Sequence, residues 1–163
     1  MKKTVLAFLL LAISANAEIF DKGNIALGVL VGGGSITTKE GQKQYSLLGA
    51  NADYFFVDDL SIGLGYTQWF GSEPSISQIT IPLNYYYPLS ENWRPYLGTF
   101  YRHTSMGGDF KDFNSYGIKA GATLKVTKRA YFGAGWVQEY YDECRNFNEC
   151  SSGYPELLFI FTF

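Results

Sequence analysis

Hydrophobic side chains alternate with glycine and polar residues along most of this 163-residue chain. The clearest example is the final segment, which begins at Tyr154 and carries Leu157, Phe159, Phe161 and Phe163 on one face. Strict alternation of this kind is typical of a β-strand with two different faces. The segment has ten residues, which is long enough for a tilted strand to cross a bilayer.

The same alternation recurs in seven earlier segments, which are bounded by Gly, Pro, Asp or Asn. The predicted strands cover residues 24–32, 45–56, 60–70, 76–87, 93–103, 115–126, 130–141 and 154–163. Each contains 9 to 12 residues, as a transmembrane strand requires, and single-chain bacterial barrels have an even number of strands. The sequence therefore predicts an all-β fold, an eight-stranded antiparallel up-and-down transmembrane β-barrel.

The connections between the predicted strands differ in length. Three are short (57–59, 88–92 and 127–129), three are long (33–42, 104–114 and 142–153), and 71–75 is intermediate. With both chain ends in the periplasm, the short turns fall on the periplasmic side and the longer loops face outside. This is the asymmetry expected of an outer-membrane barrel.

The two faces of the predicted strands decide between a soluble and a membrane barrel. A soluble ligand carrier also alternates, but its apolar face points inward. Here roughly thirty large apolar and aromatic side chains would compete for the interior of eight strands, which is too narrow for them. The opposite face is rich in glycine, which packs poorly on a surface that faces water. We therefore expect the apolar face to contact lipid.

Six charged residues fall on the predicted inner face: Asp53, Arg102, Lys119, Lys125, Glu139 and Glu156. Unpaired charges inside a low-dielectric barrel are costly, so we expect an interior network of salt bridges and hydrogen bonds. Because eight strands are about filled by their own side chains, this network should plug the barrel. A narrow polar channel is the alternative.

Aromatic residues gather near both ends of the predicted strands. Trp93, Tyr85, Tyr87 and Phe56 lie toward the periplasmic rim, and Trp69, Phe70, Tyr101, Tyr140 and Tyr141 toward the outer rim. These positions are typical of interfacial girdles. Pro82 lies in the middle of a predicted strand, where it cannot donate a ladder hydrogen bond, so we expect a bulge there.

The start of the chain has the pattern of a secretion signal. Lys2 and Lys3 precede an apolar run at residues 5–13, and residues 15–17 fit a small-x-small cleavage site. Nine apolar residues are far fewer than the about 20 that a spanning helix needs. We predict that residues 1–17 are a cleaved signal peptide and that residues 18–163 form the barrel domain. Without Lys2 and Lys3 the net charge is 11 − 15 = −4, which argues against nucleic acid as a partner.

Cys144 and Cys150 lie close together in a polar stretch. An exported protein meets an oxidising environment, so a disulfide between them is expected. The chain has two cysteines and one histidine, too few ligands for a zinc site. We expect no metal and no cofactor.

Three stretches indicate a family resemblance: residues 49–56 (GANADYFF), 60–66 (LSIGLGY) and 94–98 (RPYLG). Over the whole mature chain the sequence resembles the small outer-membrane β-barrels that include opacity-type proteins and the barrel half of the OmpA group. The resemblance implies a monomer in the outer membrane of a Gram-negative cell, surrounded by lipid and lipopolysaccharide. The terminal ladder of Leu157, Phe159, Phe161 and Phe163 looks like the signal that the outer-membrane assembly machinery reads. The family includes adhesins, structural anchors and narrow, porin-like channels.

The one candidate for catalysis is the His103-x-Ser105 pair at the predicted outer rim. It is similar to the pair in outer-membrane lipid A deacylases, which are eight-stranded barrels with Ser as nucleophile and His as base. The Glu that orients the His in those enzymes is Asn114 here, with Asp109 and Asp112 as poor substitutes. Their Asn after the Ser is Met106. We therefore expect a non-enzymatic barrel with a structural or surface-interaction role. A narrow channel and a hydrolase using Ser105 and His103 are the alternatives.

Overall fold

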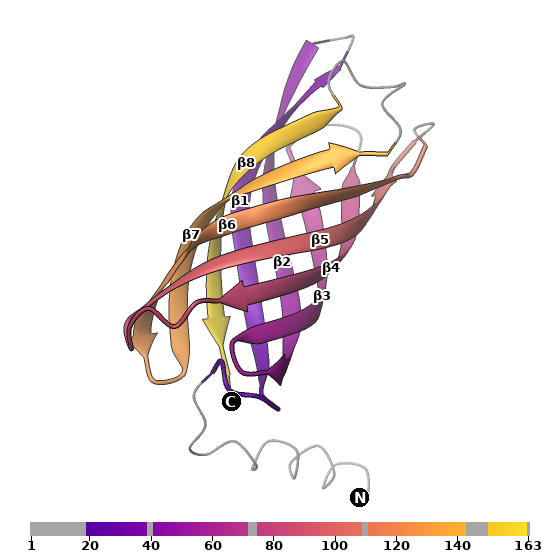
Figure 1. Ribbon diagram of the computed structural model, residues 1–163. Coiled ribbons are helices and arrows are strands. Elements are labelled where there is room, and N and C mark those ends of the chain that lie inside the picture. The colour runs from indigo at the N-terminus through magenta and orange to yellow at the C-terminus, as the bar shows by residue number, and fades with distance from the viewer. Residues whose placement is uncertain (1–18, 39–40, 72–74, 109–110, 143–149, 163) are drawn as a thin grey trace, which may run out of the picture.

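The computed structural model describes residues 19–38, 41–71, 75–108, 111–142 and 150–162. In these residues eight antiparallel strands close into a barrel in which each strand pairs with the next and β8 pairs with β1 (Figure 1). The strands are β1 (Ile25–Thr38), β2 (Gly41–Val57), β3 (Leu60–Phe70), β4 (Ile76–Tyr86), β5 (Trp93–Met106), β6 (Phe113–Thr127), β7 (Ala130–Tyr141) and β8 (Ser151–Phe161). The predicted fold class is confirmed, and β3 and β7 have the predicted bounds.

The first hairpin differs from the prediction. Residues 33–42 were expected to form a long outer loop, but β1 and β2 continue through this stretch and only residues 39–40 separate them. Ser35 is opposite Gln44, and Thr37 is opposite Gln42. The β-branched residues at 36–38 favour extended backbone, so the preceding glycines do not end the strand. As a result the hairpin projects beyond its neighbours (Figure 1).

The predicted bulge at Pro82 is also wrong. Between β3 and β4 the register is the same before and after the proline, with Ile62 opposite Leu83 and Gly65 opposite Thr80. Pairing is interrupted at the positions in between, because proline has no N–H to donate. The register shifts lie elsewhere, between Phe55 and Val57 and at residues 125–127, next to two short turns.

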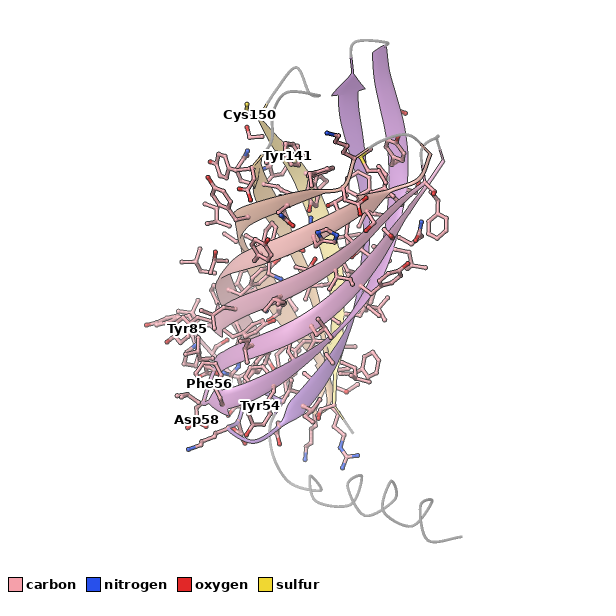
Figure 2. All side chains as sticks on the ribbon, turned by 90° about the vertical axis from the view of Figure 1, so that its right-hand side faces the viewer. Tyr54, Phe56, Asp58, Tyr85, Tyr141 and Cys150 are labelled. Atoms are coloured by element: carbon pink, nitrogen blue, oxygen red, sulfur yellow. The ribbon has the colours of Figure 1, made fainter. Side chains whose placement is uncertain are left out.

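Large apolar side chains cover the outside of the barrel, as the alternation predicted. Leu64, for example, is 59% exposed in the middle of β3. Figure 2 shows Tyr54, Phe56 and Tyr85 near the end that carries the short turn at Asp58. Among the described residues, no helix is long and apolar enough to cross a membrane.

Two of the predicted girdle residues are not on the outside. Trp69 is 5% exposed and lies within the barrel, where its Nε1 donates to Gln78 Oε1 at 2.8 Å. Tyr141 is half-buried, packs edge-on against Phe113 and hydrogen-bonds with Ser152. Neighbouring residues of a strand face opposite sides, so Trp69 and Phe70 cannot share one girdle.

Two clusters of buried side chains fill the barrel. One cluster lies at the end with the short turns and is called the periplasmic cluster after the predicted orientation; it consists of Ile19, Phe20, Ala26, Phe55, Tyr86, Tyr96, Tyr131, Leu158 and Ile160. The outer cluster consists of Tyr45, Leu47, Trp69, Ile76, Phe100, Val137 and Tyr154. Polar and charged side chains of the inner face lie among these two clusters, and they form the candidate site.

Candidate functional site: a charged interior and a polar outer rim

An ion pair between β5 and β7 is the centre of the interior network. Arg102 Nη1 donates to Glu139 Oε2 at 2.7 Å and to the Tyr154 hydroxyl at 2.6 Å, and Arg102 Nε donates to Thr80 Oγ1 at 2.9 Å. Ser115 donates its hydroxyl proton to the other carboxylate oxygen of Glu139. Glu139 is 1% exposed. Every carboxylate oxygen of Glu139 therefore has a partner, as a buried charge requires.

Glu156 on β8 lies in the same interior but has a different partner. Its Oε1 accepts a hydrogen bond from the Tyr96 hydroxyl at 2.7 Å. The Tyr96 side chain passes over Gly135 to reach Glu156, because a Cβ on Gly135 would overlap the Tyr96 hydroxyl oxygen. Likewise, a Cβ on Gly117 would lie 2.5 Å from the Phe100 ring. Glycine at these positions makes room for the aromatic rings that fill the barrel.

The remaining predicted network residues lie further apart. Asp53 is buried and accepts a hydrogen bond from Asn51, while its Oδ1 has no partner among the described residues. Lys119 is the nearby cation that acts electrostatically on Asp53. Lys125 lies near the periplasmic end of β6, opposite Tyr131, and forms no ion pair in the described part of the chain. The structure thus buries Asp53, Arg102, Glu139 and Glu156. Lys119 and Lys125 are both half-buried, Lys119 near Asp53 and Lys125 near the end of β6 that carries the short turn.

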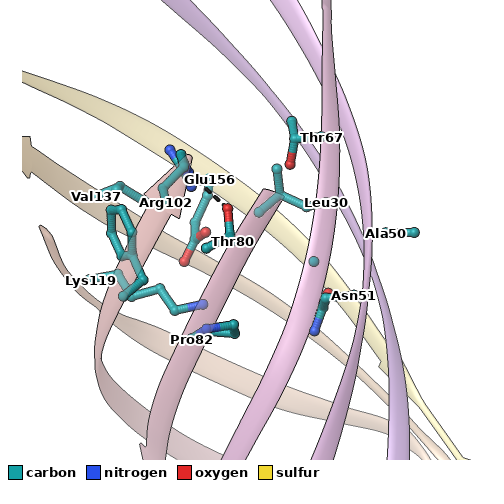
Figure 3. Close-up of a pocket in the computed structure, with 12 residues that line it drawn as sticks. Leu30, Ala50, Asn51, Thr67, Thr80, Pro82, Arg102, Lys119, Val137 and Glu156 are labelled. Carbon is teal, nitrogen blue, oxygen red and sulfur yellow. Dashed lines mark hydrogen bonds between the residues drawn. The ribbon is translucent and has the colours of Figure 1, made fainter. Parts of the chain in front are cut away.

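A small cavity of about 50 Å³ lies among these groups, lined in part by Asn51, Thr67, Thr80, Arg102, Lys119 and Glu156. Figure 3 shows Lys119 and Asn51 pointing into it. A buried water needs roughly 10–15 Å³, so the cavity has room for a few waters. Pockets for organic ligands are typically about 300–1,000 Å³. The cavity is therefore suited to hydrating the charged groups and is too small for a substrate.

Several members of the network were not predicted from the sequence: Tyr154, Ser115 and Trp69. For most of them, strand parity was the available signal, because they alternate with glycines and charges on the inner face.

A further ion pair joins Arg94 of β5 to Asp59 in the turn between β2 and β3. Burial raises the pKa of Asp59, although the Arg94 guanidinium opposes that shift.

The predicted catalytic pair lies on the outer rim. His103 Nδ1 is 2.9 Å from Asn114 Oδ1, and His103 Nε2 is 3.8 Å from Asp112 Oδ2. Ser105 donates to Asp112 Oδ2 at 3.4 Å, and the Met106 N–H donates to Asp112 Oδ1 at 3.1 Å. Within the described residues, no hydrogen bond joins Ser105 to His103. Ser105 therefore lacks the contact to the imidazole that serves as the base in a Ser–His pair.

Three predicted features fall partly or wholly outside the described residues. Cys150 is not a free thiol, but Cys144 lies outside the described part, so the disulfide between them stays a prediction. The same holds for the signal peptide at residues 1–17 and for Phe163. Leu157 and Phe159 of the proposed assembly signal are exposed on the outer face of β8.

A closed eight-stranded barrel with an apolar outer surface and a charged, filled interior defines a class: the small transmembrane β-barrels of outer membranes. No family model matches the sequence, and no curated protein matches it. Solved structures do match.

The chain is similar to Neisserial surface protein A (NspA), with a TM-score of 0.64 at 16% identity over 87% of this chain and 98% of that one. It is also similar to the N-terminal β-barrel domain of Pseudomonas aeruginosa OprF, with a TM-score of 0.64 at 17% identity. That match covers 86% of this chain and 98% of the OprF domain. A third match is Ail, the attachment invasion locus protein of Yersinia pestis, with a TM-score of 0.52 at 12% identity. That match covers 86% of this chain and 98% of Ail. At these identities the similarity shows the fold. Together with the apolar outer surface, it indicates an integral outer-membrane protein.

Proposed function

We propose that this protein is a non-conducting outer-membrane barrel that acts as a structural anchor and presents its outer hairpins for surface interaction. The observation that supports this most strongly is the filling of the barrel at two levels. Aromatic clusters occupy both halves of the interior, and the Arg102–Glu139 ion pair adds a polar barrier. An ion would have to displace packed side chains at each level.

The outer side supplies the surface for interaction. The β1–β2 hairpin projects beyond the other strands (Figure 1), and the connection between β7 and β8 contains the predicted disulfide of Cys144 and Cys150. The names of two similar proteins, a Neisserial surface protein and an attachment protein, agree with such a role. We propose these two elements as the contact points with partners outside the cell.

Planar-bilayer recording tests the closed interior. The purified, folded protein should produce no discrete conductance steps, and the same should hold for Lys125→Gln, which changes a charge outside the interior network. Discrete steps in the wild-type protein would refute the non-conducting anchor, and a change in their size with Arg102→Met would support a narrow channel through the network.

Labelling of intact cells tests which end of the barrel faces outside. A membrane-impermeant amine reagent should modify Lys111, which is exposed in the connection between β5 and β6. It should leave Lys128, in the short turn between β6 and β7, unmodified. Modification of Lys128 with protection of Lys111 would reverse the orientation and remove the basis for a surface role. We do not propose the hydrolase, because Asp112 rather than His103 is the partner of Ser105.

A further inference from the structure

The residues that precede β1 lie in the mouth of the barrel. Ile19 and Phe20 are 0% and 1% exposed. The chain turns at Gly23, whose φ of 91° is a conformation that L side chains rarely adopt. The Asn24 N–H closes this turn by donating to the Asp21 carbonyl at 3.2 Å. Through this turn the segment ahead of β1 folds back into the barrel end.

The ring of Phe20 sits in a site made of side chains from four strands. Ring centroids lie 4.7 Å away at Tyr86 and 4.8 Å away at Tyr131, and the Phe55 ring lies edge-on at 5.6 Å. The Arg94 guanidinium lies over the ring, 4.5 Å from its centroid. Aromatic and cation–π contacts of this kind each add to the burial of the ring. These four contacting residues belong to β2, β4, β5 and β7. Because the strands surround the interior of the barrel, Phe20 lies across that interior.

Backbone groups of residues 20–23 bond to turn and strand residues outside the β1–β2 register, which begins at Ile25 and Tyr54. The Lys22 N–H, for example, donates to Asp58 Oδ1 at 2.8 Å. The Asp59 N–H donates to the Phe20 carbonyl at 2.8 Å, and the Gly23 N–H donates to the Phe55 carbonyl at 2.7 Å. The barrel itself closes between β1 and β8, from the pair Leu27 and Phe161 to the pair Gly32 and Glu156. Displacing residues 19–20 would therefore leave the strand pairing intact.

We propose that Ile19 and Phe20 form a displaceable plug that closes the periplasmic end of the barrel. The plug binds in a site formed by the rings of Phe55, Tyr86 and Tyr131 and the guanidinium of Arg94. The outer cluster is made of strand side chains and stays in place when the plug leaves. Release of the plug thus exposes the inner wall to the periplasm without opening a path across the membrane.

Cysteine accessibility tests the plug. Ser61 is fully buried and is the register partner of Phe55, which contacts the Phe20 ring. A thiol at this position therefore lies level with the plug and is closed off from solvent. Ser61→Cys is introduced into a Cys144→Ser/Cys150→Ser chain, and a membrane-impermeant maleimide is added from the periplasmic side. The maleimide should label the cysteine at position 61 slowly. With Phe20→Ala added, the labelling rate should rise by about two orders of magnitude, since the truncated plug opens far more often.

Two controls separate this effect from general loosening. Thr104→Cys, buried in the outer half of β5, should stay unlabelled with and without Phe20→Ala. Gly23→Val keeps both plug side chains but disfavours the positive φ, and it should also raise labelling at Ser61→Cys. Folding of each variant is checked by its gel mobility before and after heating.

Equal labelling rates at Ser61→Cys with the plug intact and with Phe20→Ala would overturn the proposal. So would parallel increases at Ser61→Cys and Thr104→Cys, which would indicate that the whole barrel had loosened. Bilayer recordings of the same Phe20→Ala variant should show no conductance. Conductance of the wild-type protein would instead refute the non-conducting anchor, so the two proposals fail by different measurements.

Discussion

Breaking the Arg102–Glu139 ion pair from one side should destabilise the barrel strongly. Arg102→Met removes the guanidinium and leaves Glu139, which is 1% exposed, with only hydroxyl partners at Ser115 and Tyr154. Thr80 also loses its donor. Removing one partner of a buried ion pair costs about 3–5 kcal/mol, mostly because the other charge stays buried without compensation.

The double variant Arg102→Met/Glu139→Met gives the sharper result. Replacing both charges by apolar side chains of similar volume is often neutral, so we expect it to lie within about 1 kcal/mol of the wild type. Glu139→Met alone leaves the cation unpaired and should cost about as much as Arg102→Met. The double-mutant cycle should therefore show a coupling of several kcal/mol between the two sites, well above the roughly 0.5 kcal/mol expected of independent positions.

Equilibrium unfolding by urea in liposomes measures these free energies, with tryptophan fluorescence as the readout. Trp69 is in the outer cluster and bonds to Gln78, so its share of the emission reports on the filled interior. Trp93 and Trp136 are exposed on the outer face and report on the contact with lipid. If the free energy of unfolding of Arg102→Met lies within about 0.5 kcal/mol of the wild-type value, the variant behaves like an ordinary surface substitution. That result would refute the buried pair. Additive losses in the double variant would refute the coupling.

The remaining predictions concern the faces of the barrel. Leu64→Arg, in the middle of β3, should cost about 2–4 kcal/mol in the same urea assay if the outer surface contacts lipid, and a neutral result would refute that orientation. Gly135→Ala should destabilise by about 1–3 kcal/mol because its Cβ overlaps Tyr96, whereas Gly33→Ala, whose Cβ meets nothing nearer than 3.7 Å, should lose much less. Ser105→Ala should leave the acyl chains of lipid A unchanged by mass spectrometry, and a loss of deacylated product would reverse this.

Period-two alternation was sufficient to predict the barrel, because side-chain direction depends on parity alone. Parity also places Asp53, Arg102, Glu139 and Glu156 on the inner face, where all four are buried. The same rule, applied strictly, would have placed Trp69 inside with Gln78 instead of in a girdle beside Phe70. The error at Trp69 came from grouping neighbours by composition.

The pairing within the interior does not follow from alternation. Arg102 is opposite Ser115 in the ladder between β5 and β6, yet it bonds to Glu139 and Tyr154 on strands further round. Which inner residues meet depends on the stagger and tilt of the strands, and alternation within each strand does not encode these quantities. The plug was missed for a related reason, since Ile19 and Phe20 lie between the predicted signal and the first strand and belong to no alternating run.

The way the bore is filled explains why a closed state is favoured over a gated channel. Tyr96 and Phe100 on β5 lie against glycines of β6 and β7, so close that a Cβ at Gly121 would be 2.7 Å from the Tyr96 ring. An aromatic ring packed against backbone cannot swing aside by changing a rotamer, because interiors are close-packed and the facing wall does not yield. Opening the middle of the barrel therefore requires strands to separate, which breaks ladder hydrogen bonds in lipid, where no water replaces them. The periplasmic plug has no such restriction, which confines any easy opening to that end.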